Sequence, residues 1–138
     1  MYLLDTNIIS ETRRPNSVNS GVKAWLESTD AAMLYTSAIN IMELEQGILR
    51  MEHKDQAQGQ VLRAWLEQTV KPTFENRILP IDETTAAICA RLLTPDPAPE
   101  NDAWIAAAAI QHRLILVTRN TADFDHTGAR VFNPFDAV

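Results

Sequence analysis

The sequence predicts an α/β fold in which a parallel sheet is covered by helices on both faces. Short apolar runs alternate with segments whose apolar residues recur at helical spacing, and this order indicates right-handed β-α-β units. The first apolar run carries no polar alternation, which is typical of a strand buried on both faces. The chain has 138 residues without an internal repeat, low-complexity tract or linker. A single domain spanning residues 1–138 is therefore expected.

The first strand is expected in the apolar run that begins at Met1 and stops at Asp5, Thr6 and Asn7. In an open α/β sheet the ligand crevice lies outside the carboxyl ends of the strands, so Asp5 would face a site. Aspartate is also a good helix N-cap. This segment alone leaves the two roles of Asp5 open.

The segment from Asn7 to Pro72 is expected to contain helices and one strand, and its last two helices are expected to form a hairpin. Its first elements are a helix that Pro15 ends, a helix with the stripe Val18, Val22, Trp25 and Leu26, a strand at 33–36, and a helix from the N-cap Ser37 to about Met51. Gly47 inside this last helix costs about 1 kcal/mol against alanine, which indicates close approach of another element or of a second chain, or tolerance on a solvated face, with close packing slightly favoured. A polar segment, 52–60, should lead to a second helix that Pro72 ends, so that the two form a helical hairpin.

The second half continues the same alternation. We expect a strand at 77–81, a helix at 83–93 capped by Asp82, a proline-dense loop at 94–99, an alanine-rich helix opening near Asp102, a strand at 114–118, a polar loop at 119–124 and a last strand at 130–132. The many alanines of the helix near Asp102 predict close neighbours.

Composition restricts the function. No basic leader or membrane-length apolar run is present, so a cytoplasmic protein without membrane contact is expected. Cys89 is the single cysteine and stands among apolar residues, which indicates a buried, unreactive thiol. A net charge of −6 disfavours a nucleic-acid partner unless acidic residues bind divalent cations and invert the local charge.

Four carboxylates fall where one edge of the predicted sheet would gather them. Asp5 follows the first strand, Glu43 lies early in the helix after the second strand, Asp102 opens the helix before the fourth, and Asp123 follows the fourth. Without a lysine among them, such acids need protons or metal. Oxygen ligands suit Mg²⁺ and Mn²⁺, which activate water and stabilise a phosphodiester during hydrolysis.

Other chemistries fit the sequence less well. The three histidines (His53, His112 and His126) lack metal-ligand spacing, and the three tryptophans (Trp25, Trp65 and Trp104) are interpreted as packing residues. Arg13 and Arg14 are interpreted as a solvated helix end, with phosphate contact as the alternative. A phosphoryl-accepting, receiver-like domain would need a lysine where Arg119 and Asn120 stand, and a haloacid-dehalogenase-type enzyme would need aspartate at Asn7.

Four motifs in this order resemble the PIN domains of VapC and FitB-type toxins. They are L-L-D-T-N, M-E-L-E-Q-G-I, N-D-A-W-I-A-A-A-A and L-V-T-R-N-T-A-D-F, and the resemblance covers nearly the whole chain. It implies a three-layer α/β/α sandwich whose parallel sheet has the order 3-2-1-4-5. It also implies the toxin of a type II toxin–antitoxin system, an Mg²⁺- or Mn²⁺-dependent endoribonuclease. A PIN domain that binds RNA without cutting it is disfavoured by the intact set of four acids.

The resemblance also assigns residues and partners. Asp5 and Asp102 would be the most direct metal ligands, and Glu43 and Asp123 would complete the shell. The helical phase and the motif favour Glu43 over Glu45. The polar residues that would support the site are Thr6, Asn7, Thr118 and Asn120. The expected partners are RNA, a VapB-like antitoxin, a second copy in a homodimer or a larger complex with antitoxin, and operator DNA only through the antitoxin.

Overall fold

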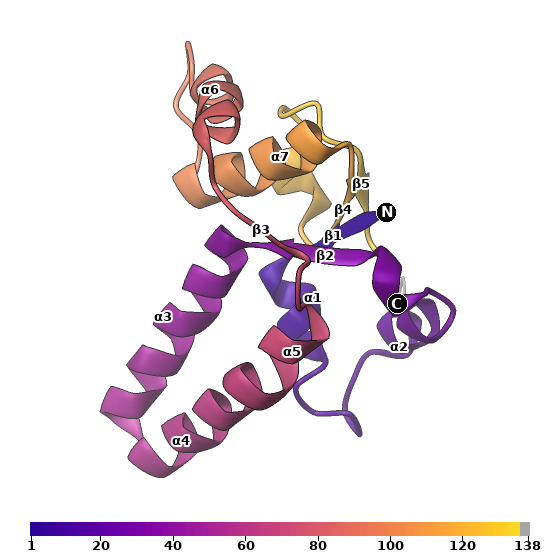
Figure 1. The fold of residues 1–138 in the computed structure, drawn as a ribbon, viewed down its shortest axis with the longest axis vertical. Helices are drawn as coiled ribbons and strands as arrows, with labels where there is room; N and C mark the ends of the chain where they lie inside the picture. The colour runs from indigo at the N-terminus through magenta and orange to yellow at the C-terminus, as the bar shows by residue number, and fades with distance from the viewer. Residues whose placement is uncertain (136–138) are drawn as a thin grey trace.

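Five parallel strands form one sheet in the order β3-β2-β1-β4-β5, which confirms the predicted order (Figure 1). The computed structural model describes residues 1–135. The strands are β1 (Tyr2–Leu4), β2 (Leu34–Ser37), β3 (Ile78–Leu79), β4 (Ile115–Val117) and β5 (Val131–Phe132). The central strand β1 pairs Leu3 with Tyr35 on one side and with Leu116 on the other.

Helices cover both faces of the sheet, as predicted. They are α1 (Thr6–Glu11), α2 (Ser20–Glu27), α3 (Ala38–Lys54), α4 (Gln56–Trp65), α5 (Lys71–Thr73), α6 (Glu83–Leu92) and α7 (Glu100–His112), with a π-helical turn at Leu66–Val70 and 3-10 turns at Ala31–Met33 and Thr121–Phe124. Figure 1 shows α6 and α7 on one side of the sheet and the α3–α5 arm with α1 on the other. Consecutive residues of a strand point to opposite faces. Leu4 accordingly packs with α1 to α4 and the π-helical turn, and Leu3 packs with α7.

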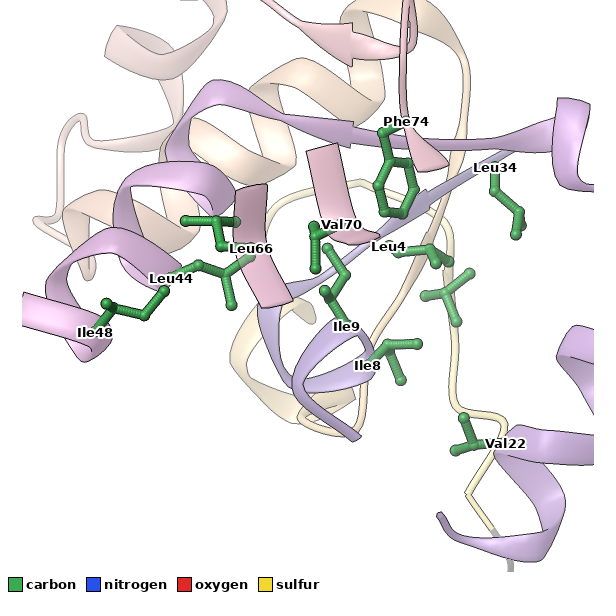
Figure 2. Packing of buried hydrophobic residues seen from close by; sticks show 11 residues of the cluster. Leu4, Ile8, Ile9, Val22, Leu34, Leu44, Ile48, Leu66, Val70 and Phe74 are labelled. Atoms are coloured by element: carbon green, nitrogen blue, oxygen red, sulfur yellow. The ribbon is translucent and has the colours of Figure 1, made fainter. Parts of the chain in front are cut away.

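The larger apolar cluster joins β1 to the helical arm. Figure 2 shows Ile9 lying beside Val70, and Leu44 of α3 lying beside Leu66. On the other face, Ala106, Ala108 and Ala109 of α7 are fully buried against the sheet, as the alanine-rich sequence predicts. This packing fixes the carboxyl ends of β1 and β4 relative to the start of α7.

The helical hairpin differs from its prediction. Residues 52–60 are helical except for Asp55, where α3 ends and α4 begins. Pro72 does not end the segment, because it lies in the first turn of α5, where a proline needs no N–H partner. A methyl group at Gly47 would touch nothing within 4 Å, so no described element of this chain packs closely there, and close approach of a second chain stays a prediction. The close approach is at Gly59, where a methyl group would lie 2.6 Å from the Glu52 Cα atom.

Smaller predictions are confirmed or shifted by a few residues. Ser37 and Asp82 cap α3 and α6, as expected. Val18 precedes α2 and Met33 belongs to the 3-10 turn before β2, so the predicted helix and the predicted strand both begin too early. Cys89 is 1% exposed, and burial raises the pKa of its thiol, in agreement with an unreactive cysteine. No described helix is long and apolar enough to cross a membrane. The cytoplasmic location and the single domain over residues 1–138 stay predictions.

Candidate metal centre

Asp5 both caps α1 and faces the carboxyl edge of the sheet, so its two predicted roles coexist. Its backbone N–H donates to the carbonyl oxygen of Val117 at 2.9 Å, which extends the pairing of β1 with β4. One carboxylate oxygen, Oδ1, accepts the N–H of Thr6 at 2.8 Å and thereby caps the helix. The residue is only 7% exposed.

Neutral donors hold the Asp5 carboxylate. The hydroxyl of Thr118 donates to Oδ2 at 2.8 Å, and the side-chain amides of Asn40 and Asn7 donate at 3.1 Å and 3.5 Å. Burial nevertheless raises the pKa of Asp5, because these hydrogen bonds only partly offset the loss of solvation. No cation pairs with Asp5 within residues 1–135. The carboxylate is therefore oriented without being neutralised.

Glu43 joins the same site through two further neutral donors. The Thr6 hydroxyl donates to Oε1 at 2.6 Å, and the Asn101 amide donates to Oε2 at 3.3 Å. Glu45 lies on another face of α3, where the Arg63 guanidinium pairs with it at 2.6 Å. The structure thus directs Glu43 toward the site, the orientation that its helical phase favoured.

Asp102 and Asp123 complete the acidic group. Asp102 lies in the first turn of α7, and Asp123 lies in the 3-10 turn that follows β4. The pKa of Asp102 is raised to about 6, chiefly by burial and then by the negative charges of Asp5, Asp123 and Glu43. The four predicted acids are therefore close enough to repel one another.

The predicted supporting residues take different parts. Thr6, Asn7 and Thr118 all contribute side-chain hydrogen bonds to the network. Asn120 contributes through its backbone, whose N–H donates to the Thr118 hydroxyl at 3.1 Å. The Asn7 amide also donates to Thr118 Oγ1 at 3.3 Å and so links the ends of β1 and β4.

Three residues near the acids were not predicted to belong to the site. Asn40 is fully buried, and its amide donates to both Asp5 and Thr6. Asn101 holds Glu43, and His126 lies close enough to lower the pKa of Asp102 slightly. The position of Asn40 three residues after the cap Ser37 was a usable signal, since a capping box places a polar side chain there.

A cleft lies beside the site between α1, α3 and α4. The cleft has a volume of about 270 Å³, and Thr6 and Glu43 line it together with Ser10, Arg13 and Gly47. Arg13 therefore lines the same cleft as Glu43, and its proposed contact with a phosphate stays open. The cleft gives an extended ligand a path to the carboxylates.

The donor set suits a hard divalent cation. All four predicted ligands are carboxylates, which are hard oxygen ligands. The threonine hydroxyls and asparagine amides that donate to them are neutral. Among residues 1–135, no three histidine, cysteine or acidic side chains converge tightly enough to bind one ion together. Mg²⁺ requires only one or two carboxylates, with water molecules in the remaining positions. The acids therefore fit an ion held partly through water.

A parallel sheet of this order with acids at its carboxyl edge defines a class of α/β proteins. The family model described as PIN domain matches residues 2–129, and the chain belongs to this family. The chain is 41% identical to Toxin FitB of Neisseria gonorrhoeae over 98% of this chain and 99% of that protein. It is 30% identical to VapC ribonuclease Y4jK of Sinorhizobium fredii, over 99% of each. The resemblance to VapC and FitB-type PIN domains is confirmed.

Solved structures give the same result. FitAB bound to the IR36 DNA fragment matches with a TM-score of 0.83 and 37% identity, covering all (100%) of this chain and 98% of that chain. A toxin–antitoxin complex from Klebsiella pneumoniae matches with a TM-score of 0.67 and 29% identity, covering 99% of each chain. The similarity extends over the complete sheet and its helices.

Proposed function

We propose that this protein is the toxin of a type II toxin–antitoxin pair, and that it hydrolyses RNA phosphodiester bonds as an Mg²⁺- or Mn²⁺-dependent endoribonuclease. The observation that carries this proposal is a group of four carboxylates that no described lysine or arginine neutralises and of which two, Asp5 and Glu43, are oriented by neutral donors. A divalent ion supplies the missing positive charge. The ribonuclease named among the relatives supports RNA as the substrate.

The proposed ligands divide into two pairs. Asp5 and Asp102 would bind the ion directly, and Glu43 and Asp123 would complete the shell and orient bound water. When bound, the ion would polarise the phosphodiester and lower the pKa of a water molecule to yield a nucleophile. Thr118 and Asn40 hold Asp5 in place, while Thr6 orients Glu43, so the ligand oxygens are positioned before substrate arrives.

A small antitoxin is the proposed inhibitor. The Klebsiella relative was solved as a toxin–antitoxin complex, and FitAB was solved bound to DNA. An apolar cavity of about 280 Å³, lined by Ile9, Trp65 and Phe74 among others, lies beside α1 and offers a surface for an apolar antitoxin segment. We propose that a VapB-like antitoxin binds this chain, that the toxin forms a homodimer or a larger complex with it, and that operator DNA is contacted only through the antitoxin.

Purified protein and total RNA test the activity. Cleavage should require Mg²⁺ or Mn²⁺, stop in EDTA and return when Mn²⁺ is restored. Asp5→Asn and Asp102→Asn should abolish cleavage and growth arrest while keeping the circular dichroism of the folded protein. Cleavage that persists without divalent metal, or at the wild-type rate in either variant, would overturn the proposal. Mapping RNA 5′ ends after brief induction of wild type and Asp5→Asn would then identify the substrate.

A further inference from the structure

Arg119 is an exposed cation whose position beside the acidic edge is fixed from three directions. It follows Thr118 directly after β4, and its backbone N–H donates to Asn7 Oδ1 at 3.1 Å. The Asn133 amide donates to its carbonyl oxygen at 3.5 Å. Its guanidinium carbon lies 4.8 Å from the centre of the Phe135 ring. Two contacts therefore fix its backbone, and one holds its charged group.

The other cations with clear partners serve the fold. Arg63 and Lys71 pair with glutamates of the hairpin, and Arg77 donates to the backbone carbonyl oxygens of Leu34 and Thr73. Arg119 instead stacks on an aromatic ring and forms no ion pair within the described part of the chain. Its five N–H donors are thus left for an external anion.

We propose that the Arg119 guanidinium, held over the Phe135 ring, binds a phosphate of the RNA chain next to the phosphate that is cleaved. The inference rests on the proposed ribonuclease function. The chain carries a net charge of −6, and its acids repel a polyanion wherever metal does not screen them. A cation whose backbone is linked through Asn7 to Asp5 supplies attraction and register at that point.

The residue type and its support suit this role. A planar guanidinium binds two phosphate oxygens at once, which a lysine ammonium does not do in the same geometry. Stacking on Phe135 orders the side chain before RNA arrives, so less conformational entropy is lost on binding. Since Asn7 hydrogen-bonds both Asp5 and the Arg119 backbone, the cation is in fixed register with the proposed ligands.

Steady-state cleavage of a mixed-sequence, single-stranded RNA pool in Mn²⁺, measured over a range of KCl concentrations, tests the proposal. Arg119→Ala should raise KM about tenfold with kcat within about twofold of wild type. The slope of log(kcat/KM) against log[KCl] should become shallower by about 0.7, the contribution of one phosphate contact on a single strand. Arg119→Lys should restore the slope and only part of the KM.

Two further variants separate this role from general effects. Phe135→Leu keeps an apolar side chain but removes the ring, and it should raise KM about threefold without changing the salt slope. Arg130→Ala is the matched control. Arg130 is also an exposed arginine, but it precedes β5 and so lies at the amino-terminal ends of the strands, away from the acids. It should leave KM and the slope unchanged. Thermal melting checks that every variant is folded.

The outcomes distinguish this inference from the function on which it rests. Wild-type protein that fails to cleave RNA in Mn²⁺ overturns both. Active wild type with an unchanged KM and salt slope in Arg119→Ala overturns only the role of Arg119, as does a fall in kcat alone. If Arg119→Ala weakens a co-purified antitoxin complex and leaves RNA kinetics unchanged, the residue binds protein and the proposal is wrong.

Discussion

Two glutamates on α3, only two positions apart, have opposite surroundings. Glu45 faces the helical hairpin, where the Arg63 guanidinium lies 2.6 Å from it and the Lys71 ammonium 3.9 Å from it. Glu43 faces the carboxyl edge of the sheet, where the Thr6 hydroxyl and the Asn101 amide donate to it. The same side chain is thus neutralised by cations in one region and only oriented by neutral groups in the other.

The difference shows how one helix can serve stability and chemistry together. Cations on the hairpin cancel the charge of Glu45 and join α3 to α4, although partly exposed ion pairs contribute only modestly to stability. Threonine and asparagine donors fix the direction of the Glu43 oxygens while leaving their negative charge intact. Unneutralised charge at the sheet edge is what a divalent cation needs.

Within this comparison of the two glutamates, the largest expected effect comes from removing each glutamate charge in turn. Glu43→Gln should lower RNA cleavage about a hundredfold, because it removes a charged oxygen from the proposed metal shell. Glu45→Gln should leave cleavage within about twofold of wild type but lower the free energy of unfolding by about 1 kcal/mol. Kinetics and urea titrations of both variants measure this contrast. Equal losses of activity in the two variants would show that Glu43 and Glu45 do not differ in their roles.

A smaller loss is expected from the buried amide that links Asp5 to Thr6. Asn40→Leu keeps a similar volume but removes both donors and leaves the Ser37 hydroxyl without its acceptor. Cleavage should fall about tenfold, and the free energy of unfolding should fall by about 1–3 kcal/mol. Gln46→Leu, at an exposed position of the same helix, is the control and should change neither. Wild-type kinetics in folded Asn40→Leu would show that the network does not position the acids.

The sequence predicted the regions in which regular patterns dominate. Apolar periodicity located the five strands, and the end-of-strand rule placed Asp5 and Asp123 near the same sheet edge. Ser37 and Asp82 were recognisable as caps because their side chains satisfy local backbone donors. Helical phase distinguished Glu43 from Glu45, since residues two apart on a helix face different ways.

Tertiary contacts decided what the sequence left unpredicted. The polar residues 52–60 are helical because α3 and α4 pack together, and this packing is close at Gly59 rather than at Gly47. The capping-box position marks Asn40 as a capping residue, but its contacts with Asp5 and Thr6 arise only because the fold brings α3 against the end of β1. Local patterns carry no information about such contacts between distant segments.

The smallest expected effect is a gain in stability that depends on pH. The pKa of Asp102, about 6 in the folded protein, exceeds its ordinary value of 3.8, so the folded state holds a proton that the unfolded state has already released. Stability from this group is therefore lost as pH rises from about 4 to about 6, and the penalty is complete above that range. Asp102→Asn removes the penalty.

Thermal melting in EDTA measures this gain. Asp102→Asn should melt about 3 °C above wild type at neutral pH and at the same temperature near pH 4. Added Mn²⁺ should raise the melting temperature of wild type and leave the variant unchanged. A variant that melts below wild type at neutral pH in EDTA would show that the Asp102 charge is stabilised rather than repelled in the metal-free protein.

Calorimetric titration of Mn²⁺ into the metal-free protein tests most directly whether the unneutralised carboxylates bind a divalent ion. Wild type and Glu45→Gln should bind Mn²⁺ with the same Kd, while Asp5→Asn should bind at least about tenfold more weakly. Wild-type protein that binds no Mn²⁺, or an Asp5→Asn variant that binds it as tightly as wild type, would contradict a metal centre at the carboxyl edge of this sheet.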